Sequence, residues 1–314
     1  MSVDKNPASA GVLFSDFLFF AGASPQSCYT AARSRIKQGQ VMMQQDGSAP
    51  RGELIVVGTG ISFGQMTEEA MAHIARADLV LSVVPNGVIN DQLLRLNARL
   101  ESMMPYYGDD RTRAQTYEAM TTRMVNEVKA GKQVCTVFYG HPGVFVTSSH
   151  QAIRRLRADG YRARMLPGVS ADACLIADIG VDPSDNGWLS FEATSFLFAE
   201  RVVDPTISML LWQIGIAGEC TLKLYEPGKN ALTVIRDVLL TAFPPDHQVC
   251  LYEAASIPGF LPRIDWFALK DFPAQRTQSY STLFIPAADL PDFAQARLAP
   301  LGMTEQELAV FDSL

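Results

Sequence analysis

The chain has 314 residues, of which 48% are hydrophobic and 19% are charged, and its formal net charge is −7. These fractions are those of an ordinary globular protein, so they exclude disorder for most of the chain, and the length predicts two domains. The acidic balance argues against a broad electrostatic grip on nucleic acid or on an anionic membrane. No apolar run reaches the roughly 18 to 20 residues that cross a bilayer, so no membrane segment is expected.

The five cysteines are widely spaced and form no C-x-x-C pair. Neither a disulfide framework nor a zinc site is predicted from this pattern, and no metal is expected. Cys135 and Cys250 stand inside apolar runs, where a reduced cysteine is typical of a buried core. We therefore expect a reducing, cytoplasmic setting.

Residues 1–51 are rich in Gly, Ser, Pro and Gln and are expected to form a flexible extension or linker. The apolar stretch Gly11–Phe20 imitates a signal peptide. However, Asp16 interrupts that stretch, and the single Lys5 is offset by Asp4. Secretion is therefore not expected.

From Glu53 the chain shows a strand, a glycine-rich turn and a helix. The apolar run Glu53–Val57 ends in the turn Gly58–Gly64, and a helix is predicted to open at Thr67. This order is typical of the first unit of a parallel nucleotide-binding sheet, whose ligands lie at the carboxyl ends of the strands. The elements predicted next are strands over Asp78–Val84, Gln133–Tyr139 and Arg162–Met165 and a helix over Thr112–Gly131.

A glycine turn alone is also typical of an ordinary tight connection between a strand and a helix. A dinucleotide enzyme would need an acidic residue at the end of the second strand to hold the ribose. That strand ends in Val84, Pro85 and Asn86, and Asp78 stands at its start, on the wrong edge of the sheet. The dinucleotide hypothesis is therefore not favoured.

Two further loops that follow predicted strands are rich in glycine and proline. The loop Tyr139–Phe145 contains Gly-His-Pro-Gly, in which the glycines allow close approach to a ligand and the proline stiffens the turn. The loop Pro167–Ala171 repeats the pattern, with Ser170 placed to cap the next helix. Such turns are often only structural, but three of them at adjacent strand ends predict the floor of a cleft.

These turns belong to a longer set of motifs that occur in order along the chain. The set comprises Val57–Gly60, Gly64–Thr67, Tyr106–Tyr117, Phe138–Phe145, Arg164–Ala171, Asp178–Pro183, Phe191–Thr194 and Ser281–Pro286. In them the sequence resembles the tetrapyrrole-methylase (class III) S-adenosylmethionine-dependent methyltransferases, and it looks closest to the borosin-type peptide backbone α-N-methyltransferases. The Tyr/Arg helix and the Gly-His-Pro-Gly-Val-Phe loop are the parts more particular to the peptide methylators.

The resemblance implies an α/β protein of two domains, with mostly parallel sheets and the cofactor cleft between the domains. It divides the chain into an extension (1–51), an N-terminal domain (52–168), a C-terminal domain (169–286) and a helical tail (287–314). The second domain is expected to have strands near Ser190, Met209–Ile216, Gln248–Glu253 and Thr282–Ile285, and its helix over Asn230–Thr241 has apolar residues at the right spacing.

The resemblance also implies a homodimer that uses S-adenosylmethionine and releases S-adenosylhomocysteine. The residues expected to line the cofactor site are Tyr139, His141, Val144, Phe145, Ser170, Ala171, Gln213, Ser281 and Thr282. A histidine is also a common general base, but beside Pro142 in a glycine turn His141 is better explained as a cofactor contact. His73, His150 and His247 are scattered along the chain and receive no function.

Methyl transfer to a backbone amide needs a base, because the nitrogen lone pair is delocalised into the carbonyl group. Arg113 precedes Tyr117 by one helical turn, so the two share a face of the expected helix. A guanidinium beside a phenol favours the phenolate and can donate to the developing oxyanion. By the resemblance, Tyr107 or Tyr117 removes the amide proton and Arg113 stabilises the negative charge.

The same residues have simpler explanations, which only the resemblance outweighs. A tyrosine on an apolar helical stripe is usually a core residue, and Arg113 alone would be a surface residue. Met104 also departs from the family pattern, because fused members commonly carry another tyrosine there. This departure leaves the shape of the substrate channel open.

Residues 287–314 end in a predicted short helix with an acidic first turn and show no apolar core peptide. This pattern favours the split form of the family, which methylates a separate ribosomal precursor peptide in trans. Two alternatives stay open: a small-molecule methylase that acts on precorrin-like tetrapyrroles, and a catalytically silent peptide-binding protein of the same fold. No nucleic-acid or membrane partner is expected.

Overall fold

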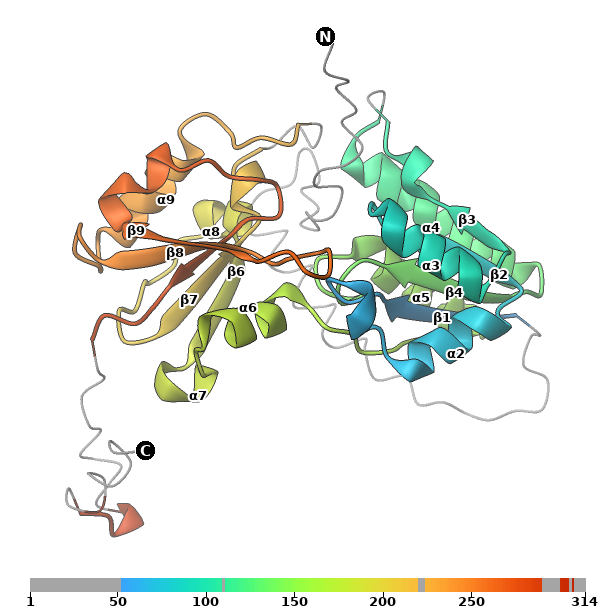
Figure 1. Ribbon diagram of the computed structural model, residues 1–314, viewed down its shortest axis with the longest axis horizontal. Helices are drawn as coiled ribbons and strands as arrows, with labels where there is room; N and C mark the ends of the chain where they lie inside the picture. The colour runs from blue at the N-terminus through green and yellow to red at the C-terminus, as the bar shows by residue number, and fades with distance from the viewer. Residues whose placement is uncertain (1–51, 109–110, 220–223, 290–299, 305–306, 308–314) are drawn as a thin grey trace.

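The computed structural model describes residues 52–108, 111–219, 224–289, 300–304 and 307. It consists of two α/β halves that lie side by side, each built on one five-stranded sheet (Figure 1). We call the part with β1–β5 the first half and the part with β6–β10 the second half. The predicted extension 1–51 and most of the predicted tail 287–314 lie outside the described residues, and the division of the chain at those boundaries stays a prediction.

The first sheet is parallel throughout, in the strand order β3-β2-β4-β1-β5. The predicted strands and the predicted long helix are confirmed to within two residues. Strand β3 was not predicted, because Glu101 and Ser102 are exposed and the strand has no apolar run. The elements of this half are β1 (Glu53–Gly58), α2 (Glu68–Arg76), β2 (Leu79–Val83), α3 (Gly87–Leu96), β3 (Leu100–Ser102), α4 (Arg113–Lys129), β4 (Gln133–Phe138), α5 (Thr147–Ala158) and β5 (Arg162–Met165).

The second sheet is mixed, in the order β6-β7-β10-β8-β9. Only β6 and β7 pair in parallel, whereas β10 pairs antiparallel with β7 and β8, and β8 pairs antiparallel with β9. The elements are α6 (Ala171–Ile179), α7 (Pro183–Asn186), β6 (Trp188–Glu192), α8 (Ala193–Phe198), β7 (Ser208–Trp212), α9 (Ala231–Leu239), β8 (Gln248–Glu253), β9 (Arg263–Ala268) and β10 (Thr282–Ile285).

The α/β class is thus confirmed, but the expectation of mostly parallel strands holds only for the first sheet. The strands β8 and β9 are joined by residues 254–262, a connection too short for the helical crossover that parallel strands need. Strand β9 was also missed by the sequence pattern. It is an edge strand whose Asp265 and Trp266 are exposed, so it lacks a buried apolar run.

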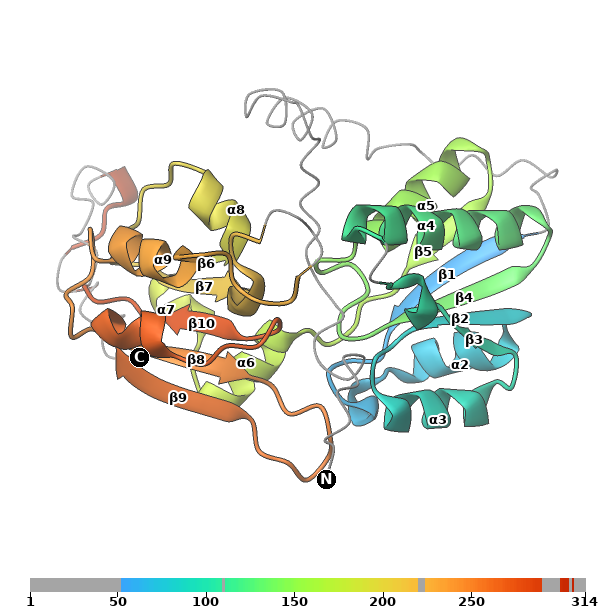
Figure 2. The ribbon, with the colours of Figure 1, turned by 90° about the horizontal axis from the view of Figure 1, so that it is seen from above.

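The first sheet is covered on both faces. Helices α4 and α5 lie on one face, and α2 and α3 lie on the other (Figure 2). Successive residues of β1 point to opposite faces of the sheet. Leu54 packs into the apolar cluster under α4 and α5, and Ile55 packs into the cluster over α2 and α3. Burial on both faces explains why these strands are continuous apolar runs. Cys135 and Cys250 are 1% and 0% exposed, which confirms their place in the core.

No helix within the described ranges is long and apolar enough to cross a membrane. No group of three or more His, Cys, Asp or Glu side chains there is arranged to hold a metal ion.

The carboxyl ends of β1 and β4 are joined by backbone contact. Gly140 N donates to Gly60 O at 2.9 Å, and Gly60 N donates to Gly140 O at 3.3 Å. At Gly58 a side chain is excluded, since an added Cβ would lie 2.0 Å from Gly140 O. Gly140 itself has a φ of +69°, which favours glycine. The predicted glycine turns are therefore positions of close backbone approach.

We expect the Gly58→Ala substitution to destabilise the protein by about 1–3 kcal/mol, the usual cost of overpacking, because the methyl group would push the loop after β4 away. Chemical denaturation measures this change. The matched control is Gly64→Ala, where an added Cβ meets nothing within 4 Å. Equal stability of the two variants would contradict the close approach.

Candidate active site

A cleft lies between the two halves, at the carboxyl ends of β1 and β4, and has a volume of about 600 Å³ including the space open to solvent. Ile61 and the loop after β4 form one wall, Ser170 and Ala171 precede and begin α6, and Trp212 and Gln213 follow the end of β7 on the second half. Ala254 and Tyr280 complete the lining.

Most of the residues expected at the cofactor site line this cleft. Ser281 and Thr282 do not, because both are fully buried directly behind Tyr280. Ser281 Oγ instead donates to Glu253 Oε1 at 2.6 Å and so holds the turn that carries Tyr280. The expected residues that do line the cleft are Tyr139, His141, Val144, Phe145, Ser170, Ala171 and Gln213.

Several lining residues were missed by sequence reasoning, among them Trp212 and Tyr280. No pattern in the sequence distinguishes an aromatic residue on a cleft wall from one in the core. In the structure the Trp212 ring lies 6.0 Å from the Phe145 ring, centroid to centroid, so the two halves face each other with aromatic groups. Phe145 and Gln213 both have a positive φ, at 54° and 61°. Non-glycine residues in this region are strained, and such strain is concentrated at functional sites.

The titratable groups of the cleft are held in their neutral forms. Burial lowers the pKa of His141, although the nearby Asp172 opposes this effect. The Nδ1 atom of His141 accepts a hydrogen bond from Gly143 N at 3.0 Å, so the neutral ring carries its proton on Nε2 and can donate from there. Burial raises the pKa of Tyr139, which therefore stays a phenol. The lone pair on His141 Nδ1 is already used by Gly143 N–H and the Tyr139 phenol keeps its proton, so both side chains present N–H or O–H donors suited to binding.

Ser170 occupies the position before α6 as the sequence predicts, but its side chain does not cap the helix. Its hydroxyl donates to Asp172 Oδ1, which also accepts from Ala173 N at 2.8 Å. The carboxylate is a stronger acceptor than a neutral hydroxyl. Asp172 therefore takes over the role that Ser170 was expected to play.

Helix α4 begins at Arg113 because of a capping box. Thr112 Oγ1 accepts from Gln115 N at 3.3 Å, and Gln115 Oε1 accepts from Thr112 N at 2.8 Å. This arrangement fixes Arg113 in the first turn and Tyr117 one turn later, on the same face.

A second contact brings Tyr107 to the same helix. Thr116 Oγ1 donates to the carbonyl oxygen of Tyr106 at 3.0 Å, which ties the short 3₁₀ helix Met104–Tyr106 to α4. The rings of Tyr107 and Tyr117 then meet edge to face, 6.4 Å apart between centroids. The three residues expected to carry the chemistry are thus gathered at the start of α4, with Tyr117 buried and Tyr107 half-buried.

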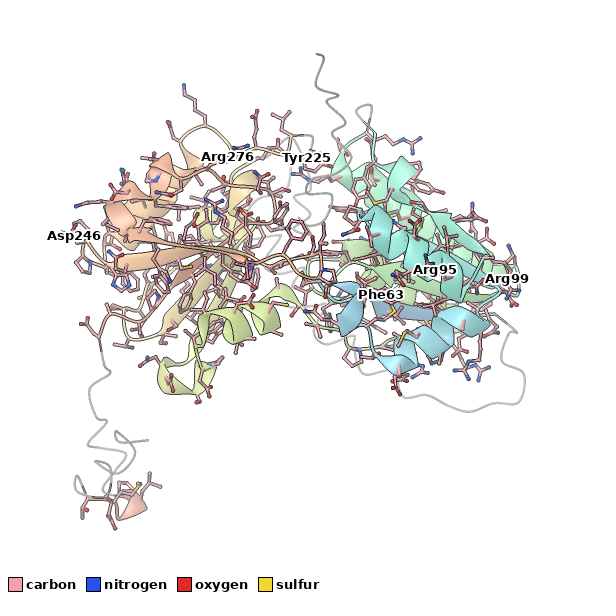
Figure 3. The ribbon with its side chains drawn as sticks, viewed as in Figure 1. Phe63, Arg95, Arg99, Tyr225, Asp246 and Arg276 are labelled. Carbon is pink, nitrogen blue, oxygen red and sulfur yellow. The ribbon has the colours of Figure 1, made fainter. Side chains whose placement is uncertain are left out.

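Arg113 is buried, so the alternative of a surface arginine is wrong. Its side chain is 5% exposed. Its Nη2 atom donates to Glu219 Oε2 at 2.9 Å, and its Nη1 atom donates to the carbonyl oxygen of Leu224 at 2.8 Å. The guanidinium also lies over the ring of Tyr225, which is found where the second half meets the first (Figure 3). Nothing in the sequence pattern singled out Glu219.

The tyrosine/arginine cluster does not line the cleft, but it shares a core cluster with one of its walls. Tyr107 packs against the same apolar cluster as Tyr139, on the face of the first sheet that α4 and α5 cover. Tyr139 in turn lines the cleft. The two groups of predicted residues are therefore connected through one part of the core.

Comparison with known proteins identifies the family. The family model of the tetrapyrrole (corrin/porphyrin) methylases matches residues 53–260. The methyltransferase/ribosomally synthesized cyclic peptide dendrothelin A precursor of Dendrothele bispora is 39% identical over 249 residues, which are 78% of this chain and 60% of that protein. The corresponding omphalotin A precursor of Omphalotus olearius is 36% identical over 277 residues, or 85% of this chain and 66% of that protein.

The chain thus spans less than two thirds of the length of these relatives. Among solved structures, the uroporphyrin-III-C-methyltransferase from Thermus thermophilus has a TM-score of 0.53 at 19% identity and covers 75% of this chain and 94% of its own. At that identity the likeness shows the fold alone. Because the family model matches more than half of the chain, across both halves, the chain belongs to the tetrapyrrole (corrin/porphyrin) methylases.

Proposed function

We propose that the protein is a methyltransferase that transfers methyl groups from S-adenosylmethionine to backbone amide nitrogens of a ribosomally made peptide. The observation that supports this most is the cluster of Tyr107, Arg113 and Tyr117, which offers a base and an oxyanion donor to a poorly nucleophilic amide. The relatives named as methyltransferase/cyclic peptide precursors agree with a peptide substrate.

The lining of the cleft fits the cofactor. Aromatic faces from Phe145, Trp212 and Tyr280 suit both a flat adenine ring and a positively charged sulfonium. His141 offers an N–H donor, and the glycines beside it let backbone groups approach the ligand. S-Adenosylmethionine supplies an activated methyl group whose release from sulfur drives the reaction.

The residues of this chain contribute deprotonation, alignment and charge stabilisation. One of the two tyrosines accepts the amide proton in its phenolate form. As the proton leaves, negative charge grows on the amide oxygen, and Arg113 donates to it from a buried position where hydrogen bonds to charge are strong. His141 and Tyr139, both neutral, hold ligands and do not abstract protons.

Supply of the peptide in trans, a homodimer and a cytoplasmic location belong to the same proposal. The first is supported by the pattern of residues 287–314, the second by the family resemblance and the third by the cysteine pattern. The competing function is methylation of a precorrin-like small molecule, which the name and the fold of the family support. In that case the tyrosine/arginine cluster would have no part in turnover. A catalytically silent peptide binder of this fold would bind neither the cofactor nor its product.

Phe145→Ala should weaken binding of S-adenosylhomocysteine by about tenfold, because the substitution removes an aromatic wall of the cleft. Isothermal titration calorimetry measures the affinity. Phe198→Ala, at a residue 49% exposed on α8, is the control and should leave binding unchanged. Wild-type protein that binds no S-adenosylhomocysteine would favour the silent binder.

Tyr107→Phe, Tyr117→Phe and Arg113→Lys test the chemistry. One of the two tyrosine variants removes the base, and that variant should lose about 10²- to 10³-fold in kcat. Arg113→Lys should lose as much, since each change removes a group used only in the transition state. The readout is mass-spectrometric counting of methyl groups on the part of the dendrothelin A precursor that this chain does not match.

Tyr161→Phe, at a half-buried tyrosine elsewhere in the first half, is the control for loss of a hydroxyl. It should retain full activity. If all three cluster variants also kept full activity on the peptide, or if a precorrin-like substrate were methylated equally well by wild type and variants, the peptide proposal would be rejected.

Supply in trans is tested by incubating the protein with S-adenosylmethionine alone. Its own mass should stay unchanged, while an added peptide should gain mass in steps of one methylene. Mass gain on the protein's own C-terminal peptide would sink the trans mode and would indicate a self-modifying enzyme.

A further inference from the structure

We infer that Glu219 is a positioning residue: its carboxylate, supplied by the second half, orients the guanidinium of Arg113 so that the unpartnered Nε–H can donate to the substrate oxygen. The inference rests on the proposed function, in which Arg113 stabilises the developing oxyanion. It adds to that proposal the residue that orients Arg113 and the Arg113 atom, Nε, that donates to the oxyanion.

The first support is the burial of the ion pair. The side chains of Arg113 and Glu219 are 5% and 4% exposed, and their charged atoms are 2.9 Å apart. Two charges removed from water need excellent geometry to compensate for lost hydration, and removal of one partner leaves the other uncompensated. The pair also joins residues 106 positions apart, from different halves. It therefore fixes the first half's arginine relative to the second half.

The second support is the way in which the guanidinium's donors are used. Nη1 and Nη2 each donate one N–H, to Leu224 O and to Glu219 Oε2 respectively. The remaining nitrogen, Nε, is fully buried and has no hydrogen-bond partner among the described residues. A buried donor without a partner is costly in a native structure and calls for an explanation. An amide oxygen of a bound peptide would provide the missing acceptor.

The third support is that Glu219 is itself firmly held. Its backbone N–H donates to Ile216 O at 3.1 Å, and the preceding Gly218 N donates to Thr194 Oγ1 at 3.2 Å. Thr194 lies in the first turn of α8, which the buried Glu192 carboxylate caps through Thr194 N and Ser195 N. The carboxylate of Glu219 thus projects from a backbone tied to the second half's core, as a positioning group requires.

If Glu219 had a purely structural role, its substitution would have a different effect on kcat. If the pair only joined the halves, its loss would lower stability but leave the kcat of the folded enzyme intact. If Glu219 orients Arg113, its loss lowers kcat, because small misplacements of a catalytic group are costly. The affinity for S-adenosylhomocysteine stays unchanged in that case, since neither partner lines the cleft.

The test compares wild type with Glu219→Gln and Glu219→Ala, using the peptide described above. Glu219→Gln keeps the shape and one hydrogen-bond acceptor and should lower kcat about tenfold, whereas Glu219→Ala should lower it by about 10²-fold. Affinity for S-adenosylhomocysteine should change less than twofold in both. The melting temperature verifies that each variant is folded, and Glu219→Gln remains informative if the alanine variant fails to fold.

The matched control is Glu118→Gln. Glu118 lies on α4 as Arg113 does and pairs with Arg155 at 2.6 Å, but both side chains of this pair are about half exposed, at 53% and 44%. Removal of this carboxylate should leave kcat unchanged.

A double-mutant cycle with Arg113→Lys then asks whether Glu219 acts through Arg113. In the Arg113→Lys background, Glu219→Gln should cost little further activity. Wild-type kcat in both Glu219 variants, or losses that simply multiply, would overturn the inference while leaving the proposed function intact. Wild-type protein that methylates no peptide would instead reject the proposed function, and this inference with it.

Discussion

The contact on which the site depends is the close backbone approach of Gly58 and Gly60 to Gly140. It joins the ends of two neighbouring parallel strands, and no side chain fits between them. The loop that follows Gly140 carries His141 and Phe145, so the position of the cleft's wall is set by backbone rather than by side-chain packing. Parallel strands buried on both faces supply the rigid base for this loop.

The second half adds what a single sheet cannot provide. It contributes Trp212 and Gln213 to the cleft and Glu219 to the start of α4. Its mixed sheet places the ends of β7 and the turn before β10 side by side, so that Gln213 and Tyr280 face the same space. The cleft therefore includes residues from both halves, and the tyrosine/arginine cluster of the first half is contacted by Glu219 of the second.

Much of the first half could be predicted from the sequence, because buried parallel strands are continuous apolar runs and Gly-rich turns mark their carboxyl ends. The capping box Thr112–Gln115 likewise marks where α4 begins. The exposed strands β3 and β9 were missed, since half-exposed short strands have no comparable signal. The antiparallel pairing of the second sheet was also missed, because apolar runs alone do not give strand direction.

The sequence pointed to residues of a local motif on the cleft wall, but it did not point to partners that are distant in sequence. The expected residues of the loop after β4 line the cleft, whereas Trp212 and Tyr280 looked like any other aromatic residue. The hydroxyl of Ser170 bonds Asp172 because a carboxylate two residues away outcompetes the backbone. The ion pair of Arg113 with Glu219 joins positions separated by 106 residues, and a single sequence carries no record of such a contact.

That separation also has a consequence for synthesis. A ribosome adds about 5 to 20 residues per second, so several seconds pass between the appearance of Arg113 and that of Glu219. The first half has its own sheet and its own helices, and it can begin to fold in that interval. Until the second half arrives, however, its arginine has no counter-charge and must remain hydrated. The ion pair between the two halves is therefore completed late in synthesis, after both of its residues have been made.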